Sequence, residues 1–503
     1  MARITDLANE LLSMIVANLD QPSLVSFALV TRRCRVVAQD VLFQNIRILK
    51  DRENNHQSVL FVSFIATLLR RPDLAEKVKT LTLHQPGCTY FDDVDDVPPD
   101  ALSNASKFVA VVEHIEEYEV QENLAEVLYD GDEHYWYYNL PHGTIAVWTT
   151  ILLGQVKNLE KLDLICCTQL SLRFGRGGNF PLPALFGYDE WGIHNESIPD
   201  IEEFPGLQSL QQLRIHGNDF ELGTWYTLPN LRKLELDCQE GFQGTQIDTQ
   251  KHHEPDLDVL HTLLVRCSMC LLQPSTERGP RNWNAPANPL ETLQYFTLPK
   301  HLELEFVNGA ESVDWIVADE HPKIKEVPIL HGYNEGSLNT FFAEWQALER
   351  PLRGIESLTI RFAKPFTGEW NNVMPADSLA FLSTLEHLTV PREALTHPND
   401  EMNSPVLSAF LPPQLESLCV YKPDTHIFTW IRELLDVRDA FPKFSKLELQ
   451  FDDEGDGWPA TCAEMHEHCR VEDYSWKRFR EAGIEVKCCC HGRSFVQPAV
   501  PAW

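Results

Sequence analysis

Cysteine and histidine side chains gather near the C-terminus, where their types suit metal binding. Thiolates and imidazoles are ligands that zinc prefers, and two groups of them can close a tetrahedral site. Three adjacent cysteines are poorly spaced to bind one ion together, however, and residues 484–486 before them are typical of a last short strand. We therefore expect neither a metal nor another cofactor. The first group is Cys462, His466, His468 and Cys469, and the second is Cys488, Cys489, Cys490 and His491.

Motifs of catalysis are absent from the sequence. It contains no G-x-S-x-G nucleophile elbow, no G-x-x-x-x-G-K phosphate loop and no H-E-x-x-H zinc motif. The glycine-rich residues 175–178 lack the third glycine and the following helix of a dinucleotide-binding loop. We therefore expect a protein that is not an enzyme, and we keep a hydrolase with an unrecognised site as a third hypothesis behind two binding functions.

The charge and the apolar content exclude several classes of protein. The chain of 503 residues has a net charge of −32, whereas contacts with phosphate groups need clustered lysine and arginine. No stretch approaches the roughly 18 apolar residues that a membrane span needs, and the N-terminus lacks the apolar run of a signal peptide. The 13 cysteines are then typical of reduced thiols. We expect a cytoplasmic and/or nuclear protein that binds neither nucleic acid nor a membrane.

A pattern L-x-x-L-x-L, in which Ile, Val or Phe also occur, recurs along most of the chain. From Leu231 onward its first positions are spaced by 29, 33, 31, 31, 30, 30 and 29 residues. Such a period predicts one short strand per unit and a return segment, often helical, with the units stacked side by side. Residues 337–349 have the helical periodicity of a return segment. The first positions are Val78, Leu159, Leu210, Leu231, Leu260, Leu293, Ile324, Ile355, Leu385, Leu415 and Phe444.

The early units are separated by longer segments, which predict insertions. One of them, at about residues 86–156, is acidic and has no Lys or Arg between Phe108 and Val156. An acidic run is typical of a solvated surface, and a dock for a basic partner is the alternative. The aromatic residues 135–138 within it favour either a recognition loop or packing on the edge of the repeats.

The repeat register predicts which side chains point outward from the core, onto the concave side of the array. They are the two neighbours of the fourth pattern residue in each unit and the residue after the sixth, because side chains alternate along a strand. These positions hold five acidic and six basic residues, so we expect an outer face whose charges balance. The positions that we expect to contact a target protein are Arg214, His216, Arg266, Arg361 and Tyr421.

Three short helices are predicted within the first fifty residues. The apolar positions between Leu7 and Leu19 have helical spacing. Asp20 and Pro22 end this helix and begin the next, since Asp is a good N-cap and Pro fits a first turn, and Thr31 caps a third helix. So small a unit buries little apolar surface by itself, so we expect it to dock on another structure. A cap for the downstream repeats is the alternative.

This segment resembles the F-box, the adaptor-binding motif of cullin-type ubiquitin ligase substrate receptors. The resemblance rests on residues 7–15, on residues 19–24 and on residues 30–38. The chain departs from the family at Ala8, where a proline is usual, and at Cys34, where an aromatic residue often stands. The resemblance implies a surface for a Skp-type adaptor, although some of its residues must hold the helices together instead. These residues are Leu7, Leu11, Leu12, Ile15, Leu19, Leu24 and Val30.

The recurring units are similar to leucine-rich repeats of an irregular kind, because the asparagine expected after the strand is missing from nearly every unit. We therefore expect an α/β fold in which a three-helix F-box precedes a leucine-rich-repeat-like solenoid, with a compact α/β fold as the alternative. The predicted domains are the F-box at 1–50, the solenoid at 51–487 and a C-terminal tail at 488–503.

The resemblance implies the substrate-recognition subunit of an SCF-type (Skp–cullin–F-box) E3 ubiquitin ligase. Such a subunit binds a Skp-type adaptor through the F-box, reaches the cullin and RING subunits through the adaptor, and holds an unidentified target protein on the repeats. The alternative is a non-catalytic leucine-rich-repeat scaffold or inhibitor with a degenerate F-box.

Overall fold

The structure of the protein is a computed structural model of the whole chain, and its class is α/β. The larger of its two described sheets contains twelve parallel strands and one antiparallel strand, and helices accompany them. The chain divides into two compact units, one of Met1–Leu234 with Glu254–Val259 and one of Glu235–His253 with Leu260–Trp503. The structure describes residues 7–49, 57–85, 97, 99–112, 140, 145–166, 204–216, 228–238, 260–268, 299–307, 336–346, 354–362, 373–396, 407–423, 427–451, 473–490 and 493–495.

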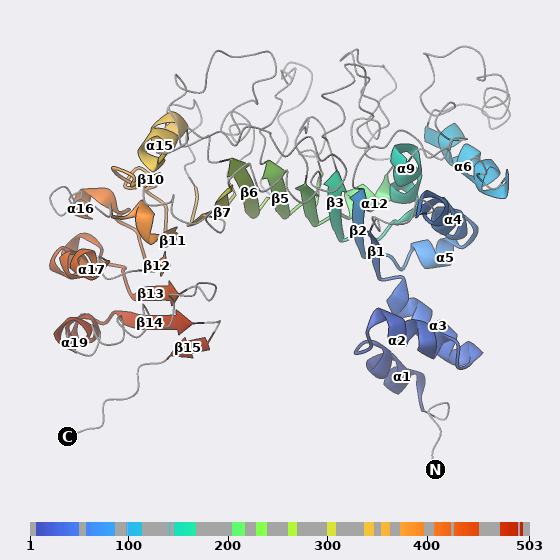
Figure 1. Cartoon of the computed structure of the whole chain (residues 1–503), viewed down its shortest axis with the longest axis horizontal. Helices are drawn as coiled ribbons and strands as arrows, with labels where there is room; N and C mark the ends of the chain where they lie inside the picture. The colour runs from blue at the N-terminus through green and yellow to red at the C-terminus, as the bar shows by residue number, and fades with distance from the viewer. Residues whose placement is uncertain are drawn as a thin grey trace, which may run out of the picture. The chain divides into compact units, whose positions relative to one another are not determined.

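The first unit begins with three short helices and continues as strands that alternate with helices (Figure 1). β1, β2, β3 and β4 are parallel neighbours in chain order. Helix α9 packs against α4, α6 and α12. The helices are α1 Asn9–Val16, α2 Gln21–Ala28, α3 Arg32–Leu42, α4 Gln57–Arg70, α5 Pro72–Ala75, α6 Pro99–Val112, α9 Ile145–Gln155 and α12 Pro205–Gln208, and the strands are β1 Asn45–Leu49, β2 Thr80–Gln85, β3 Lys161–Cys166 and β4 Gln212–His216.

In the second unit, helices α15, α16, α17 and α19 lie along one side of the strands (Figure 1). Parallel neighbours are β6, β7, β9, β11, β12, β13 and β14, and β15 is antiparallel to β14. The strands are β6 Thr262–Ser268, β7 His301–Val307, β9 Ser357–Phe362, β11 His387–Pro391, β12 Ser417–Tyr421, β13 Lys446–Phe451, β14 Glu485–Cys490 and β15 Arg493–Phe495, with β8 Gly336–Ser337 and β10 Val373–Met374 as a separate pair. The helices are α15 Leu338–Gln346, α16 Leu407–Phe410, α17 Ile427–Asp436 and α19 Asp473–Glu481, with 3-10 turns at Arg392–Ala394 and Arg438–Ala440.

The recurring leucine pattern sets where the strands begin and which side chains they bury. β9 begins two residues after Ile355, and its side chains alternate, with Leu358 and Ile360 buried while Ser357 and Thr359 lie on the outer side. The same offset of two residues holds at Val78, Leu159, Leu210, Leu231, Leu260, Leu385, Leu415 and Phe444. The strand that follows Leu231 is β5 Lys233–Cys238, and the boundary between the two units falls within it. The predicted strand register is therefore confirmed at these units.

The regular spacing predicted between Leu260 and Ile355 is wrong. β7 pairs with β6 on one side and with β9 on the other, so one strand stands where the pattern placed two. Pro299 is buried and takes the first position of this unit, and the pattern did not allow a proline there. The buried residues of β7 are Leu302, Leu304 and Phe306. The predicted strands after Leu293 and Ile324 fall on residues outside the described ranges.

The sheet extends past both domain boundaries that the sequence predicts. β1 lies within residues 1–50 and pairs with β2, and β14 and β15 include residues 488–490 and 493–495 of the predicted tail. The predicted return helix near residue 337 is α15. Residues 113–139 of the acidic insertion, and Cys462, His466, His468, Cys469 and His491, lie outside the described residues. None of the helices that the structure describes is long and apolar enough to cross a membrane.

Candidate functional site

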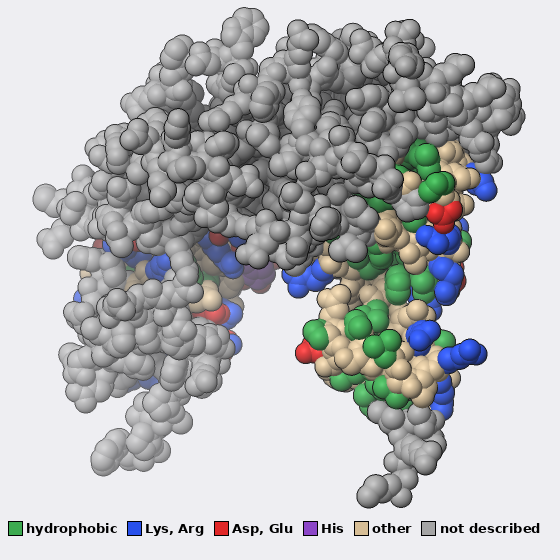
Figure 2. All heavy atoms as spheres, turned by 45° about the vertical axis from the view of Figure 1, so that its right-hand side comes forward, with side chains coloured by type: hydrophobic (Ala, Val, Ile, Leu, Met, Phe, Trp, Pro, Cys, Tyr) green, Lys and Arg blue, Asp and Glu red, His purple; other side chains and the backbone are tan. Residues whose placement is uncertain are grey.

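Large hydrophobic side chains are exposed on the three N-terminal helices. Among the described residues, all six exposed large hydrophobic side chains lie in this segment, with exposed fractions from 48% for Leu11 to 73% for Leu29. Figure 2 shows hydrophobic side chains gathered over these helices. Exposed apolar side chains that gather in this way are typical of a surface that a partner covers. We call these six residues the apolar surface: Leu11, Met14, Val25, Leu29, Val30 and Val36.

A separate set of side chains forms the core beneath the apolar surface. Leu12 and Leu24 belong to this core, with exposed fractions of 0% and 6%. They therefore hold the helices together, whereas the resemblance to the F-box implied that they contact an adaptor. Burying a leucine stabilises a fold by about 1.5–3 kcal/mol. The buried residues of the core are Leu12, Val16, Leu24, Phe27, Cys34, Val37 and Ala38.

The other residues of the predicted adaptor surface are accessible to different degrees. Leu11 and Val30 belong to the apolar surface, and Leu7, Ile15 and Leu19 are partly buried. Four residues of the apolar surface were not among the predicted adaptor contacts: Met14, Val25, Leu29 and Val36. Helical spacing contained the signal for them, since Met14 is three residues after Leu11 and Leu29 is four residues after Val25.

Caps and one arginine position the helices. The Asp20 carboxylate accepts a hydrogen bond from the Ser23 N–H at 2.9 Å, and the Thr31 hydroxyl accepts one from the Cys34 N–H at 3.1 Å, as the sequence predicts. Hydrogen bonds from Ser23 lower the pKa of Asp20. Arg33 of α3 donates to the side chain of Asn9 at 2.7 Å and to the Leu7 carbonyl at 2.6 Å, which joins α3 to the start of α1.

Ala8, where a proline is usual in the F-boxes that this segment resembles, has a backbone geometry that suits proline. Its φ of −63° and ψ of 154° precede α1, and proline fixes φ near −65°. We expect Ala8→Pro to leave the melting temperature unchanged or to raise it, with a gain of up to about 1 kcal/mol because the unfolded chain loses freedom. Thermal unfolding measures this effect.

Ala17→Pro is the matched control for that substitution. Ala17 has a similar φ of −62°, but its N–H donates to the Ser13 carbonyl at 2.9 Å, and proline removes that bond. We expect a loss of about 3 kcal/mol at Ala17. Equal losses at Ala8 and Ala17 would contradict the geometry at Ala8.

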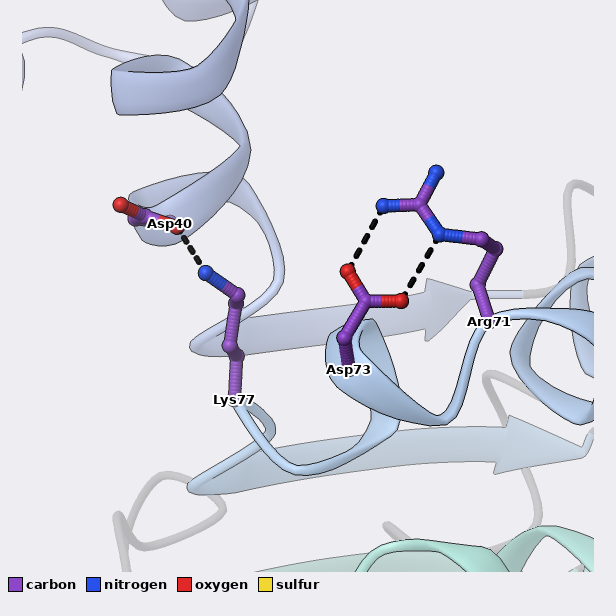
Figure 3. A network of polar contacts seen from close by, with 4 residues as sticks. All are labelled: Asp40, Arg71, Asp73 and Lys77. Atoms are coloured by element: carbon purple, nitrogen blue, oxygen red, sulfur yellow. Dashed lines mark hydrogen bonds and ion pairs between the residues drawn. The ribbon is translucent and has the colours of Figure 1, made fainter.

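The helices connect to the sheet without a long linker. Only residues 43–44 separate α3 from β1, and the Gln44 carbonyl accepts hydrogen bonds from the N–H groups of Lys79 and Thr80 at 3.0 and 2.9 Å. Lys77 forms an ion pair with Asp40 of α3 (Figure 3). These contacts fix the orientation of the three helices on the first strands.

A second ion pair orders the turn that carries Lys77. Arg71 donates two hydrogen bonds, each of 2.7 Å, to the carboxylate of Asp73 (Figure 3). The hydrogen bonds from Arg71 lower the pKa of Asp73. The paired fork geometry restrains the segment between α4 and β2, where the contact with Asp40 is made.

Four of the five residues predicted to contact a target lie on the outer side of the strands. Arg214, Arg266 and Arg361 lie next to buried positions of β4, β6 and β9, as the register predicts. Tyr421 ends β12, and the ammonium of Lys422 lies 5.3 Å from the centre of its ring. His216 ends β4, and its side chain is outside the described structure. Arg214 and His216 belong to the first unit, and Arg266, Arg361 and Tyr421 belong to the second.

The arginines of the outer face take part in ion pairs between neighbouring strands. Arg266 contacts Glu305 at 2.5 Å, and Arg361 contacts Glu303 at 3.1 Å. Arg214 lies 3.9 Å from Asp163. Glu303 and Glu305 were not among the predicted outward positions, because the leucine pattern placed this repeat unit at Leu293. Surface pairs of this kind stabilise a fold by about 0–1 kcal/mol, so a target that binds these arginines would exchange one ion pair for another.

A group of possible metal ligands lies at the start of two neighbouring strands. Glu386, His387 and Glu416 offer ligand atoms that all lie within 4.8 Å of one another. Parallel register brings them together, since His387 pairs with Ser417. Lys443 lies 4.0 Å from the Glu416 carboxylate and offsets part of its charge. His387 is exposed and the group is one ligand short of a tetrahedral shell, so we assign no metal to it.

A scan against models of protein families finds no match to this chain, and a search of curated proteins finds no match either. The argument for function therefore rests on the side chains and their arrangement.

Proposed function

We propose that this chain is the substrate-recognition subunit of an SCF-type E3 ubiquitin ligase. In this proposal, α1, α2 and α3 act as an F-box and hold a Skp-type adaptor through the apolar surface. The cullin and RING subunits join through the adaptor. The outer side of the strands, which we interpret as leucine-rich-repeat-like, holds a target protein that the sequence does not identify.

The apolar surface is the observation that carries this proposal. Its six side chains are exposed although a complete core lies directly beneath them, so the helices do not need these side chains for their own packing. Elsewhere in the described structure, large hydrophobic side chains are buried or partly buried. A partner that covers the apolar surface would gain about 25 cal/mol for each Å² of apolar area that leaves water. The resemblance to the F-box identifies that partner as a Skp-type adaptor.

The proposed mechanism is proximity. The receptor performs no bond chemistry, and it raises the effective concentration of target lysines near the ubiquitin-loaded enzyme. A short and restrained connection between α3 and β1 supports this mechanism, because it holds the adaptor-binding helices in a defined position on β1 and β2. The proposed ligase works in the cytoplasm or the nucleus.

The second candidate is a non-catalytic leucine-rich-repeat scaffold or inhibitor with a degenerate F-box. Cys34 favours it, because this residue is buried in the core of the helices where the family often has a larger aromatic side chain. In this alternative the apolar surface no longer binds an adaptor, and the strands alone bind a protein.

Co-purification with a Skp-type adaptor tests the proposed function. We expect the full chain to capture the adaptor and a chain of residues 45–503 to lose it. The truncation begins at Asn45 because β1 pairs with β2 from this residue onward, so the shorter chain keeps the whole strand. Circular dichroism shows whether both chains are folded.

Two results would count against the receptor function. Failure of the folded full chain to capture the adaptor would favour the scaffold. Capture by both chains would place the adaptor contact outside the three helices.

A further inference from the structure

Three arginines of α3 lie close together in the sequence but differ in their contacts. Arg33 bonds to Asn9 and Leu7 of the same helical segment. Arg32 and Arg35 are exposed, and their side chains form no ion pair within the part of the chain that the structure describes. Arg33 is therefore needed to hold α3 against α1, whereas Arg32 and Arg35 are available to a partner.

Helix geometry places these two arginines beside the apolar surface. Arg32 and Val36 are four residues apart on α3, so they share one face of the helix. Val36 is 60% exposed, and Val30, which precedes the cap of α3, is 55% exposed. Arg35 is three residues after Arg32, so these two side chains are also neighbours on the helix surface. On α3, the apolar surface therefore has arginines along its edge.

The positive charge along this edge contrasts with the negative net charge of the chain. The whole protein has a net charge of −32, yet exposed arginines flank the apolar side chains of α3. On the α1 side of the apolar surface, Glu10 lies in the first turn of the helix, where the helix dipole stabilises a carboxylate. Protein interfaces commonly have an apolar centre and a polar rim, and the rim here is basic along α3.

We propose that the partner of the apolar surface carries carboxylates around an apolar groove, placed opposite Arg32 and Arg35. This inference rests on the proposed function, in which the partner is the Skp-type adaptor, and it adds the charge of the surface that the adaptor must present. Charges at the rim of an interface act mainly on the rate of association. The arginines therefore steer an acidic adaptor toward this small part of an otherwise acidic chain.

The test compares association rates of the full chain with a purified Skp-type adaptor by surface plasmon resonance. The variant is Arg32→Gln with Arg35→Gln, which keeps side-chain length and polarity. The control is Lys157→Gln with Lys477→Gln, which changes the net charge of the chain equally at two exposed lysines outside the three helices. Melting temperatures show whether both variants fold as the parent chain does.

We expect the arginine variant to associate about threefold or more slowly at low salt, with a smaller change in the dissociation rate. The control should associate at close to the parent rate, because its two lysines lie outside the three helices. At about 1 M salt the Debye length is about 3 Å, so the arginine variant and the parent chain should associate at equal rates.

Two other results have distinct meanings. Equal association rates of the parent and the folded arginine variant at low salt would overturn the inference and leave the proposed function intact. A folded parent chain that does not bind the adaptor at any salt concentration would overturn the proposed function, and the inference with it.

Discussion

A chain carrying Leu11→Glu and Met14→Glu is expected to lose adaptor binding while it keeps its melting temperature. Both side chains belong to the apolar surface, with exposed fractions of 48% and 65%, so a carboxylate at either position stays in water in the free protein. In the complex the same carboxylates would be buried without a partner, which costs several kcal/mol. Each 1.4 kcal/mol is tenfold in affinity, so we expect a loss of about 100-fold or more. Isothermal titration calorimetry with the adaptor measures it.

Two controls separate the surface from the core beneath it. Ser13→Glu adds a carboxylate at an exposed position of the same helix, about 200° around the helix from Leu11, and adaptor binding should remain. Leu12→Ala removes a side chain that is 0% exposed and should cost about 2–5 kcal/mol of stability. If the folded variant with Leu11→Glu and Met14→Glu bound the adaptor as the parent chain does, the apolar surface would not be the docking site.

Phe341→Ala is expected to destabilise the second unit by about 3–5 kcal/mol. Phe341 is 1% exposed and lies in α15. Its ring is 5.3 Å from that of Phe306 on β7, 5.4 Å from that of Phe342 and 5.6 Å from that of Trp345, in edge-to-face arrangements. Loss of the ring leaves a cavity between the helix and the strands and removes these aromatic contacts. Urea denaturation followed by circular dichroism measures the change.

Gln346→Ala is the matched control, because Gln346 is an exposed residue of the same helix. The free energy of unfolding of this variant should stay within about 0.5 kcal/mol of the parent value. The folded Phe341 variant should still bind the adaptor, since the apolar surface belongs to the first unit. A loss of less than about 1 kcal/mol at Phe341 would contradict the packing of α15 against the strands.

Much of the local structure follows from short sequence patterns. Asp20 and Thr31 cap helices where the sequence predicts them, because capping depends on hydrogen bonds within three residues. The strands that follow the leucine pattern begin at the expected offset, since alternation along a strand depends only on neighbouring residues. These features are local, and so a single sequence suffices to predict them.

The unit at β7 shows where a pattern is insufficient. Pro299 is buried at the first position of this unit, where the pattern requires an aliphatic residue or phenylalanine. Regular spacing then favoured strands after Leu293 and Ile324. The pairing of β7 with both β6 and β9 depends on contacts between residues that are far apart in the chain, and spacing alone does not report such contacts.

The division between core and surface in the first three helices also depends on tertiary structure. Leu11 and Leu12 are adjacent and chemically identical, yet one is half exposed and the other is fully buried. Helical periodicity places both on a broad apolar stripe. Only the positions of α2 and α3 decide which leucine faces them.

By itself, the sequence determined the α/β fold class, the three N-terminal helices with their caps, and which side chains point outward on most strands. The tertiary structure decided which apolar residues remain exposed on α1, α2 and α3, which arginines pair within the molecule, and how the helices attach to β1 and β2. The reason is that secondary structure and side-chain alternation depend on neighbours along the chain. Exposure and ion pairing depend on neighbours in space, such as Asp40 and Lys77.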